Sequence, residues 1–226
     1  MAGVRSLFLA MIAALAVALF QQEGRQPLSF DMIDVGGGLQ VMRHEVTIAE
    51  WRKCISEGGC SFMPKAGLGA TDDNFPVTGV GALDVEEFIA WAGKVSGQEL
   101  RLPTLDEWYA FSEVPPFRPK KIFTDPRLAW AATYGSEGRI DPTLRKSSGF
   151  GAGSKGIADV KGNVWEWTST CVVTVTGATH HCPAYFAAGE HEAKVPVFVR
   201  DPSAGGCATG TPPAHLGFRL VLDSPN

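Results

Sequence analysis

Apolar residues recur with a helical period in the first half of the chain. The clearest start is at Thr47, where the Thr47 hydroxyl and the Glu50 carboxylate form a capping box that satisfies two free backbone amides. Trp51, Cys54 and Ile55 follow at helical spacing and form one apolar stripe. This pattern predicts a short helix with a tryptophan on its inner face.

Two further helices are predicted by similar signals. Asp84 and Glu87 form a second capping box, and Gly97 is a typical helix end. The buried face of this second helix is predicted to contain Val85, Phe88, Ile89, Ala92 and Val95. Thr104 and Glu107 cap a third helix that follows soon after.

Alternating apolar and polar residues predict strands elsewhere in the chain. Residues 28–46 favour one or two strands, and residues 76–80 favour a short apolar strand. Strands are predicted again at 164–175 and 195–200, and the last strand covers 216–222.

The strand signal is most distinctive around two closely spaced tryptophans. Trp165 and Trp167 alternate with Glu166 directly after a Gly-Asn turn. This alternation predicts a half-buried strand in which both indoles face one side and the carboxylate faces the other. A carboxylate held between two large aromatic anchors suits a buried hydrogen bond or a hard cation.

The region between the third helix and the later strands has no sustained period. Residues 115–155 mix proline, glycine and charge, which predicts a long loop with room for one short helical turn. The chain as a whole contains 26 glycines and 15 prolines, so turns and irregular segments should be abundant. Short helices followed by short antiparallel strands predict an irregular, loop-rich α+β domain.

The N-terminus has the pattern of a secretory signal peptide. A positive charge at Arg5 precedes an uncharged run from Leu7 to Phe20, which is shorter than the roughly 20 residues that span a bilayer. A small-x-small cleavage site then predicts a signal peptide at residues 1–18, with an end as late as about residue 22. The alternative is a short uncleaved anchor. Either reading places the protein in the periplasm or outside the cell.

The remaining ~205 residues suit one sizeable domain, predicted at 28–224. The net charge of −4, with scattered basic residues, disfavours nucleic acid and anionic membranes as partners. No later segment is long and apolar enough to cross a membrane, so we expect no integral membrane domain after signal cleavage.

Five cysteines in an exported chain indicate disulfides and one residue left over. Proximity in the sequence favours Cys54 with Cys60, across a Gly-Gly turn, and Cys171 with Cys182, across a segment that has the alternation of a hairpin. Cys207 is then unpaired. Sequence alone does not determine this connectivity.

A zinc site at His180, His181 and Cys182 is a weaker hypothesis. Adjacent histidines on a strand point to opposite faces, and no second pair of closely spaced cysteines accompanies them.

Four sequence blocks in a fixed order resemble one known family. They are Pro-Val-Thr-Gly-Val at 76–80, Arg-Leu-Pro-Thr with Glu-Trp at 101–108, Asp-Val-Lys-Gly-Asn-Val-Trp-Glu-Trp-Thr at 159–168, and Leu-Gly-Phe-Arg-Leu-Val at 216–221. Together they are similar to the formylglycine-generating enzyme family, the sulfatase-modifying-factor domain. The resemblance covers roughly residues 30–222. It implies a variant of the C-type lectin fold with long loops and bound calcium.

The resemblance implies a calcium site in the loop before the tryptophan strand. The matching ligands would be the side chains of Asp159 and Glu166 and the backbone carbonyls of Gly162 and Val164. Hard oxygen atoms next to a glycine turn are chemically suitable for calcium. The alternative is that both carboxylates bind loop amides instead. The family's second calcium site would fall at residues 132–138, where no ligands match.

The catalytic pattern of the family is incomplete in this chain. Its oxidising members use two cysteines, a few residues apart, that hold copper(I) as thiolates. Here Arg200 and Ser203 match the preceding motif, but only Cys207 follows, and the connection to the last strand is short. Copper binding is therefore not expected, and formylglycine formation is doubtful.

The remaining candidates for chemistry are Cys207, Ser203 and His215, with Cys207 in a glycine-rich setting that predicts an exposed thiol. The alternative is that Cys207 is a spare cysteine. His44 is better explained as a packed surface histidine. Arg219, like Arg101, lies next to apolar anchors and should pair with buried carboxylates or carbonyls.

The favoured hypothesis is an exported member of this family that has lost the copper site and acts as a maturation or modifying factor for another exported protein or cofactor. One alternative is a non-catalytic, calcium-stabilised, lectin-like module that binds a protein or small molecule. The second alternative is a true formylglycine-generating oxidase that uses Cys207 with an unexpected partner.

Overall fold

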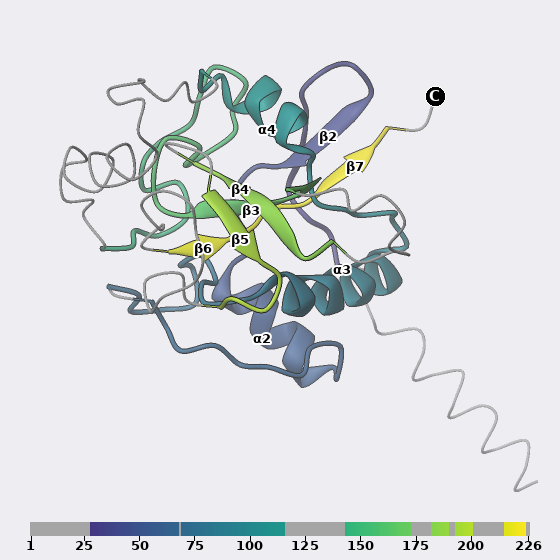
Figure 1. Ribbon diagram of the computed structural model, residues 1–226, viewed down its shortest axis with the longest axis vertical. Helices are drawn as coiled ribbons and strands as arrows, with labels where there is room; N and C mark the ends of the chain where they lie inside the picture. Colours follow the sequence, from purple (N-terminus) through teal and green to yellow (C-terminus); the bar gives the residue numbers. More distant parts are fainter. Residues whose placement is uncertain are drawn as a thin grey trace, which may run out of the picture.

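The computed structural model describes residues 28–67, 69–115, 143–172, 182–189, 193–200 and 215–224. Within these residues the chain forms an α+β fold of three helices and two small sheets (Figure 1). The helices are α2 (Ile48–Ser56), α3 (Ala82–Ser96) and α4 (Leu105–Ser112). The strands are β1 (Met32–Asp34), β2 (Leu39–Met42), β3 (Trp165–Cys171), β4 (Ala184–Ala188), β5 (Ala193–Pro196), β6 (Leu216–Gly217) and β7 (Val221–Asp223).

Capping explains where the helices begin. The boxes predicted at Thr47 and Thr104 are both present, with the Glu50 and Glu107 carboxylates accepting from the cap amides. The second helix begins earlier than predicted. Its N-terminal cap is Gly81, whose amide donates to Asp84 at 2.8 Å, so Asp84 lies in the third helical position rather than at the cap.

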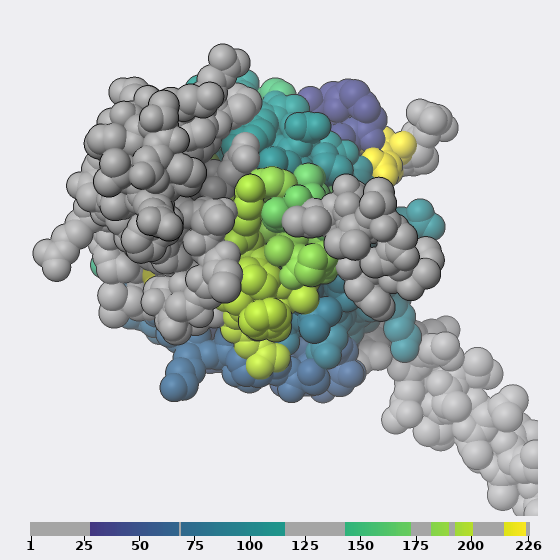
Figure 2. Space-filling view, in the orientation of Figure 1, coloured from purple at the N-terminus to yellow at the C-terminus, as the bar shows by residue number. Residues whose placement is uncertain are grey.

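The strands form two sheets, and the chain passes from one to the other at residues 218–220, between β6 and β7. One sheet has the order β1-β2-β7, and the other has the order β5-β4-β3-β6. All pairings are antiparallel except that of β3 with β6. Figure 2 shows the yellow-green β4 and β5 at the surface of one face of the molecule.

Three predicted strands differ from the observed ones. The strand predicted at 195–200 is β5, which begins at Ala193 and already ends at Pro196. Residues 76–80 form no strand: Pro76 makes an isolated bridge with Thr47 while Val77 donates to the Val46 carbonyl. The single strand expected at 216–222 is two strands, because Phe218 to Leu220 leave one sheet and enter the other.

In the core, aromatic side chains pack between α2, α3 and the segment from Phe218 to Leu220 that joins β6 to β7. Trp51 stacks on Phe88 with ring centroids 5.5 Å apart, and Phe218 meets both rings edge-on. In Figure 1, α2 and α3 lie together at one end of the molecule and α4 lies near the other, with the four-stranded sheet between them. Helix α4 contacts β3 and β4.

The first half of strand β3, Trp165–Thr168, is buried on both faces, so the prediction of a half-buried strand was wrong there. Glu166 and Trp167 have no exposed surface, and Trp165 is almost as buried. The Trp167 indole donates to the Val80 carbonyl, next to α3, and Glu166 meets Trp108 on α4. The strand lies inside the fold because helices cover both of its sides.

Strand β6 comes unusually close to its neighbours at Gly217. A Cβ atom at this position would lie 2.9 Å from the Val77 carbonyl oxygen and 3.1 Å from a Val164 methyl group. Contacts that close leave no room for a side chain. Gly217 therefore sets the spacing between β3 and the segment that contains Val77.

Both predicted disulfides are present, Cys54–Cys60 and Cys171–Cys182. The first closes the end of α2, and the second links the end of β3 to Cys182, two residues before β4. Among the residues that the structure describes, no helix is long and apolar enough to cross a membrane. The predicted signal peptide, the hairpin residues 173–181 and the region 132–138 lie outside the described residues.

Candidate functional site

The centre of the fold is a fully buried ion pair. Arg219 and Glu166 have side chains 0% and 1% exposed, and two guanidinium nitrogens donate to the two carboxylate oxygens at 2.6 and 2.7 Å. The Trp108 indole donates to the same carboxylate at 3.1 Å. This parallel, bidentate geometry is the strongest form of arginine–carboxylate contact.

Arg219 also binds three backbone carbonyls with its remaining donors. The acceptors are Met42, the last residue of β2, Arg43, which follows it, and Ala158, in the loop before β3. Burial alone would lower the pKa of Arg219, but the facing Glu166 carboxylate more than reverses this effect and the pKa is raised. One guanidinium thus joins the two sheets and the loop between them.

A second carboxyl group lies near this pair without any hydrogen bond. Glu45 is fully buried, and within the described residues neither of its carboxyl oxygens has a partner. Burial raises the pKa of Glu45 to about 8; the Arg219 charge opposes this, while Glu166 and Asp159 add to it. Glu45 therefore holds a proton over most of the neutral range.

The third carboxylate, Asp159, organises the loop before β3. It accepts hydrogen bonds from the Ser148 amide and from the Phe150 amide, the latter at 2.7 Å. Its own backbone is left-handed, with φ of 62°. Burial raises the pKa of Asp159 against the effect of these amides. Asp159 acts as the anchor of a tight turn.

These contacts bear on the predicted calcium ligands Asp159, Gly162, Val164 and Glu166. Both oxygens of Glu166 face a guanidinium, whose charge would repel a calcium ion at the same oxygens. The set does not fit calcium in this geometry, and calcium binding stays an untested prediction.

Among the proposed catalytic residues, only His215 is described; Ser203 and Cys207 lie outside the described residues. The His215 carbonyl accepts from the Trp165 amide at 3.0 Å, which fixes its backbone beside β3. His44, considered a surface histidine, is partly buried, with its Nδ1 2.9 Å from the Glu45 carbonyl oxygen.

Arg101 pairs with carboxylates as predicted, but these carboxylates are not buried. It binds Glu107 and Asp223 at 2.7–2.8 Å. Hydrogen bonds from Arg101 lower the pKa of Glu107 and of Asp223. The pair ties α4 to β7 at the surface, so its role is structural.

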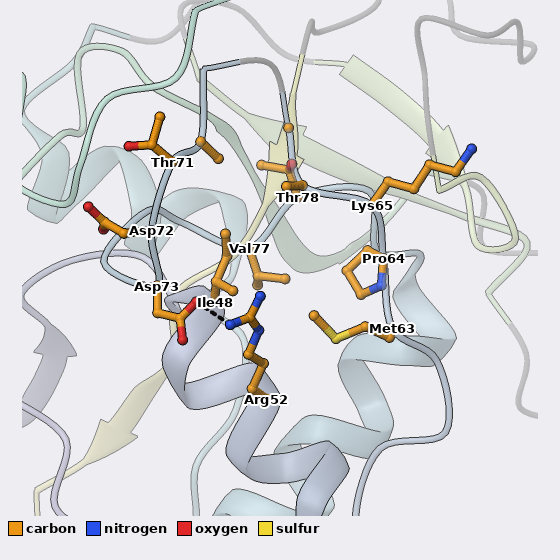
Figure 3. Close-up of a pocket in the computed structure, with 13 residues that line it drawn as sticks. Ile48, Arg52, Met63, Pro64, Lys65, Thr71, Asp72, Asp73, Val77 and Thr78 are labelled. Carbon is orange, nitrogen blue, oxygen red and sulfur yellow. Dashed lines mark ion pairs between the residues drawn. The ribbon is translucent and has the colours of Figure 1, made fainter.

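A cavity of about 260 Å³ lies beside α2, where the sequence indicated no site (Figure 3). Its floor contains Ile48, Val77 and Thr78, and Arg52 and Lys65 stand among the residues around it. The full lining is Ile48, Arg52, Met63, Pro64, Lys65, Ala66, Gly67, Ala70, Thr71, Asp72, Asp73, Val77 and Thr78. A Cβ atom on Gly67 would lie 3.5 Å from the His215 ring, so the cavity is near the one described catalytic candidate.

Sequence reasoning missed Glu45 and most of this cavity. Glu45 has the sequence context of a surface residue after a strand, and no spacing marks it as buried. The cavity residues lie in an irregular segment without a period. The Pro-Val-Thr-Gly-Val block was the one signal that pointed to this region.

The model of the sulfatase-modifying factor enzyme 1-like domain matches residues 21–224. The chain belongs to this family. No curated protein sequence matches the chain. A structure of PvdO from Pseudomonas aeruginosa has 20% identity and a TM-score of 0.52, covers 82% of this chain and 80% of its own, and shows that the fold is shared.

Two other solved structures from the comparison are more distant in shape. CarF has 20% identity and a TM-score of 0.45, with 83% of this chain and 87% of CarF covered. Treponema denticola variable protein 1 has 16% identity and a TM-score of 0.47, with 85% and 91% covered. In the present chain, the signature Trp-Glu-Trp segment is the inner strand β3. Its Glu166 pairs with Arg219 of the closing Gly-Phe-Arg block.

The first prediction concerns the buried pair. Arg219→Met should lower the free energy of unfolding by about 3–5 kcal/mol, since it leaves Glu166 buried and unpaired. Arg43→Met removes an exposed pair with Asp31 and should cost less than about 1 kcal/mol. Urea unfolding of both variants measures the difference, and equal losses would contradict the central role of Arg219.

The second prediction concerns Glu45. The folded protein binds a proton that the unfolded chain, with a pKa near 4.5, releases, so stability falls as pH rises from about 4.5 through about 8. The slope should reach up to about 1.4 kcal/mol per pH unit. Glu45→Gln cannot titrate and should flatten this slope. An exposed-site control, Glu99→Gln, should keep it, and an unchanged slope in Glu45→Gln would refute the assignment.

The third prediction concerns calcium. After extensive chelation, added Ca²⁺ should leave the thermal midpoint unchanged, because Glu166 is committed to Arg219. If Ca²⁺ instead raises the midpoint and Glu166→Gln abolishes the rise, the calcium site implied by the family resemblance is restored. Asp159→Asn tests the other side-chain ligand in the same assay.

Proposed function

We propose that this protein is an exported maturation or modifying factor that acts on another exported protein or its cofactor, without two-cysteine copper chemistry. The proposal rests on family membership together with one observation about its cysteines. That observation is the pairing of four of the five cysteines with one another.

The pairing limits what metal chemistry the chain can perform. Copper(I) held as in the oxidising relatives needs two thiolates, and a disulfide sulfur is not a thiolate. With Cys54–Cys60 and Cys171–Cys182 closed, Cys207 is the one cysteine of the sequence left for that role. A second thiolate would have to come from another molecule.

The same disulfides support export. Disulfide bonds persist in oxidising compartments such as the periplasm and the extracellular space, and they are rare in the cytosol. This agrees with the predicted signal peptide at residues 1–18. We therefore place both the protein and its substrate in the periplasm or outside the cell.

The position of the described candidate residue supports a modified active site. His215 begins the segment that leads into β6, and it lies next to Gly67 at the edge of the cavity beside α2. In this proposal, the exported substrate binds on that side of the molecule, and His215 and any contribution from Ser203 or Cys207 act there.

The fourth prediction tests the function. Exported proteins from a strain without this protein should include at least one whose intact mass or cofactor content differs from that in the parent strain. Wild-type protein supplied in trans should restore the parental mass or cofactor content. The Cys207→Ser variant should do the same if no thiol chemistry is needed. Mass spectrometry of the exported fraction measures this, and an unchanged exported fraction would contradict a maturation role.

A copper titration provides the control. The purified protein, with its disulfides intact, should bind no stoichiometric tight Cu(I). Tight binding that is lost in Cys207→Ser would support the oxidase alternative instead. An exported protein that copurifies without any mass or cofactor change would indicate a binding module.

A further inference from the structure

We propose that the cavity beside α2 is a peptide subsite that takes one apolar side chain of the substrate, next to an acidic residue. This inference rests on the proposed function and specifies its substrate class. The cavity holds about 260 Å³, just under the range of about 300–1,000 Å³ that whole small-molecule ligands occupy. Its size therefore suits one side chain with its flanking backbone.

The walls of this cavity are held in place by α2. The Trp51 indole donates to the Phe62 carbonyl at 2.9 Å, directly before the wall that begins at Met63. On the opposite wall, the Ala49 amide donates to the Asp73 carbonyl at 2.9 Å. Because both walls are anchored to one helix, the cavity exists without a ligand and binding costs little ordering.

The floor combines apolar surface with one unsatisfied hydroxyl. Ile48 and Val77 face the cavity, with Met63 and Pro64 at one side (Figure 3). Thr78 is only 5% exposed, and within the described residues its hydroxyl has no hydrogen-bond partner. The hydroxyl is not one of the fully buried unpaired polar atoms of the described residues, which belong to Glu45 and Ser147, so it keeps access to the cavity. A ligand's amide or carbonyl group can form a hydrogen bond with it there. A peptide backbone supplies both groups.

The charges around the cavity favour an acidic neighbour. Arg52 is paired with Asp73, and Asp72 is paired with Lys146. Lys65 has no ion pair among the described residues, so one positive charge is left over although the whole chain carries −4. The side chain of Lys65 is exposed and its four-carbon stem lets the ammonium reach a carboxylate beside the apolar anchor.

The fifth prediction uses purified full-length mature protein and labelled synthetic peptides. An acetylated Gly-Gly-Leu-Asp-Gly-Gly peptide should bind more tightly than versions with Leu-Lys or Ser-Asp at the centre, by about tenfold each, which corresponds to about 1.4 kcal/mol. Fluorescence anisotropy measures the dissociation constants. Equal affinity for the three peptides, or no binding at about 1 mM, the weak end of specific recognition, would overturn the proposal.

Three variants locate the binding to the cavity. Ala66→Trp, at an exposed lining position, should block it and abolish binding of the Leu-Asp peptide. Thr78→Val should weaken binding about tenfold. The thermal midpoint should stay the same, because within the described residues the Thr78 hydroxyl makes no hydrogen bond whose loss would destabilise the fold. A fall in the midpoint with unchanged affinity would refute the role of Thr78.

A charge exchange tests Lys65 specifically. Lys65→Glu should reverse the preference, so that the Leu-Lys peptide binds more tightly than the Leu-Asp peptide. Lys94→Glu, an exposed lysine on α3 outside the cavity lining, makes the same charge change and should keep the wild-type preference. Equal effects of the two variants would show a general charge effect and overturn the subsite.

The outcomes separate this subsite from the proposed function. Peptide binding is measured on the protein alone, whereas the maturation role is measured on the exported proteins of a strain. If the protein shows no selectivity among the peptides but still restores the mass change in the exported fraction, the subsite is refuted and the proposed function stands. Selectivity with no change in any exported protein supports the subsite and refutes maturation.

Discussion

The structure depends on one guanidinium group placed where water cannot reach it. Arg219 holds the Glu166 carboxylate and the carbonyls of Met42, Arg43 and Ala158, so a single side chain connects both sheets and the loop between them. A buried ion pair of this kind contributes less to stability than its short distances suggest, because both charges lose their water. Its larger effect is on specificity, since any other arrangement of these segments would leave a charge unpaired in the core.

Beside this pair lies a buried carboxyl group, Glu45, that accepts no hydrogen bond from any residue that the structure describes. Glu45 avoids the cost of a buried charge by keeping its proton, because burial raises its pKa and the negative charges of Glu166 and Asp159 raise it further. The centre of the molecule therefore contains three acidic groups in three different states: one paired with arginine, one bound to loop amides and one protonated. These charged groups stabilise the fold, whereas the peptide subsite that we propose lies elsewhere, beside α2.

Local signals predicted the parts of the fold that depend on neighbouring residues. The capping boxes at Thr47 and Thr104 and both disulfides were correct because a few adjacent residues determine them. The failures involved long-range packing. Burial of both faces of β3 and the break at Phe218 to Leu220 depend on elements far away in the sequence, and neither alternation nor period reports on them. The prediction that Arg219 pairs with a buried carboxylate is confirmed, but the sequence did not identify Glu166 as that carboxylate. Calcium binding at Glu166 stays a prediction.

The close approach at Gly217 has a consequence for how this protein can diversify. A side chain on this glycine would collide with the Val77 backbone, in the cavity floor, and with Val164, which leads into the signature strand. The lack of a side chain at Gly217 thus sets the spacing between the cavity floor and the core. Apart from Ile48 and Arg52 on α2, the residues that line the cavity lie on the irregular segment between α2 and α3. Substitutions in the loop residues can therefore change the shape of the cavity one at a time, whereas the distance from the cavity floor to the core stays fixed by Gly217.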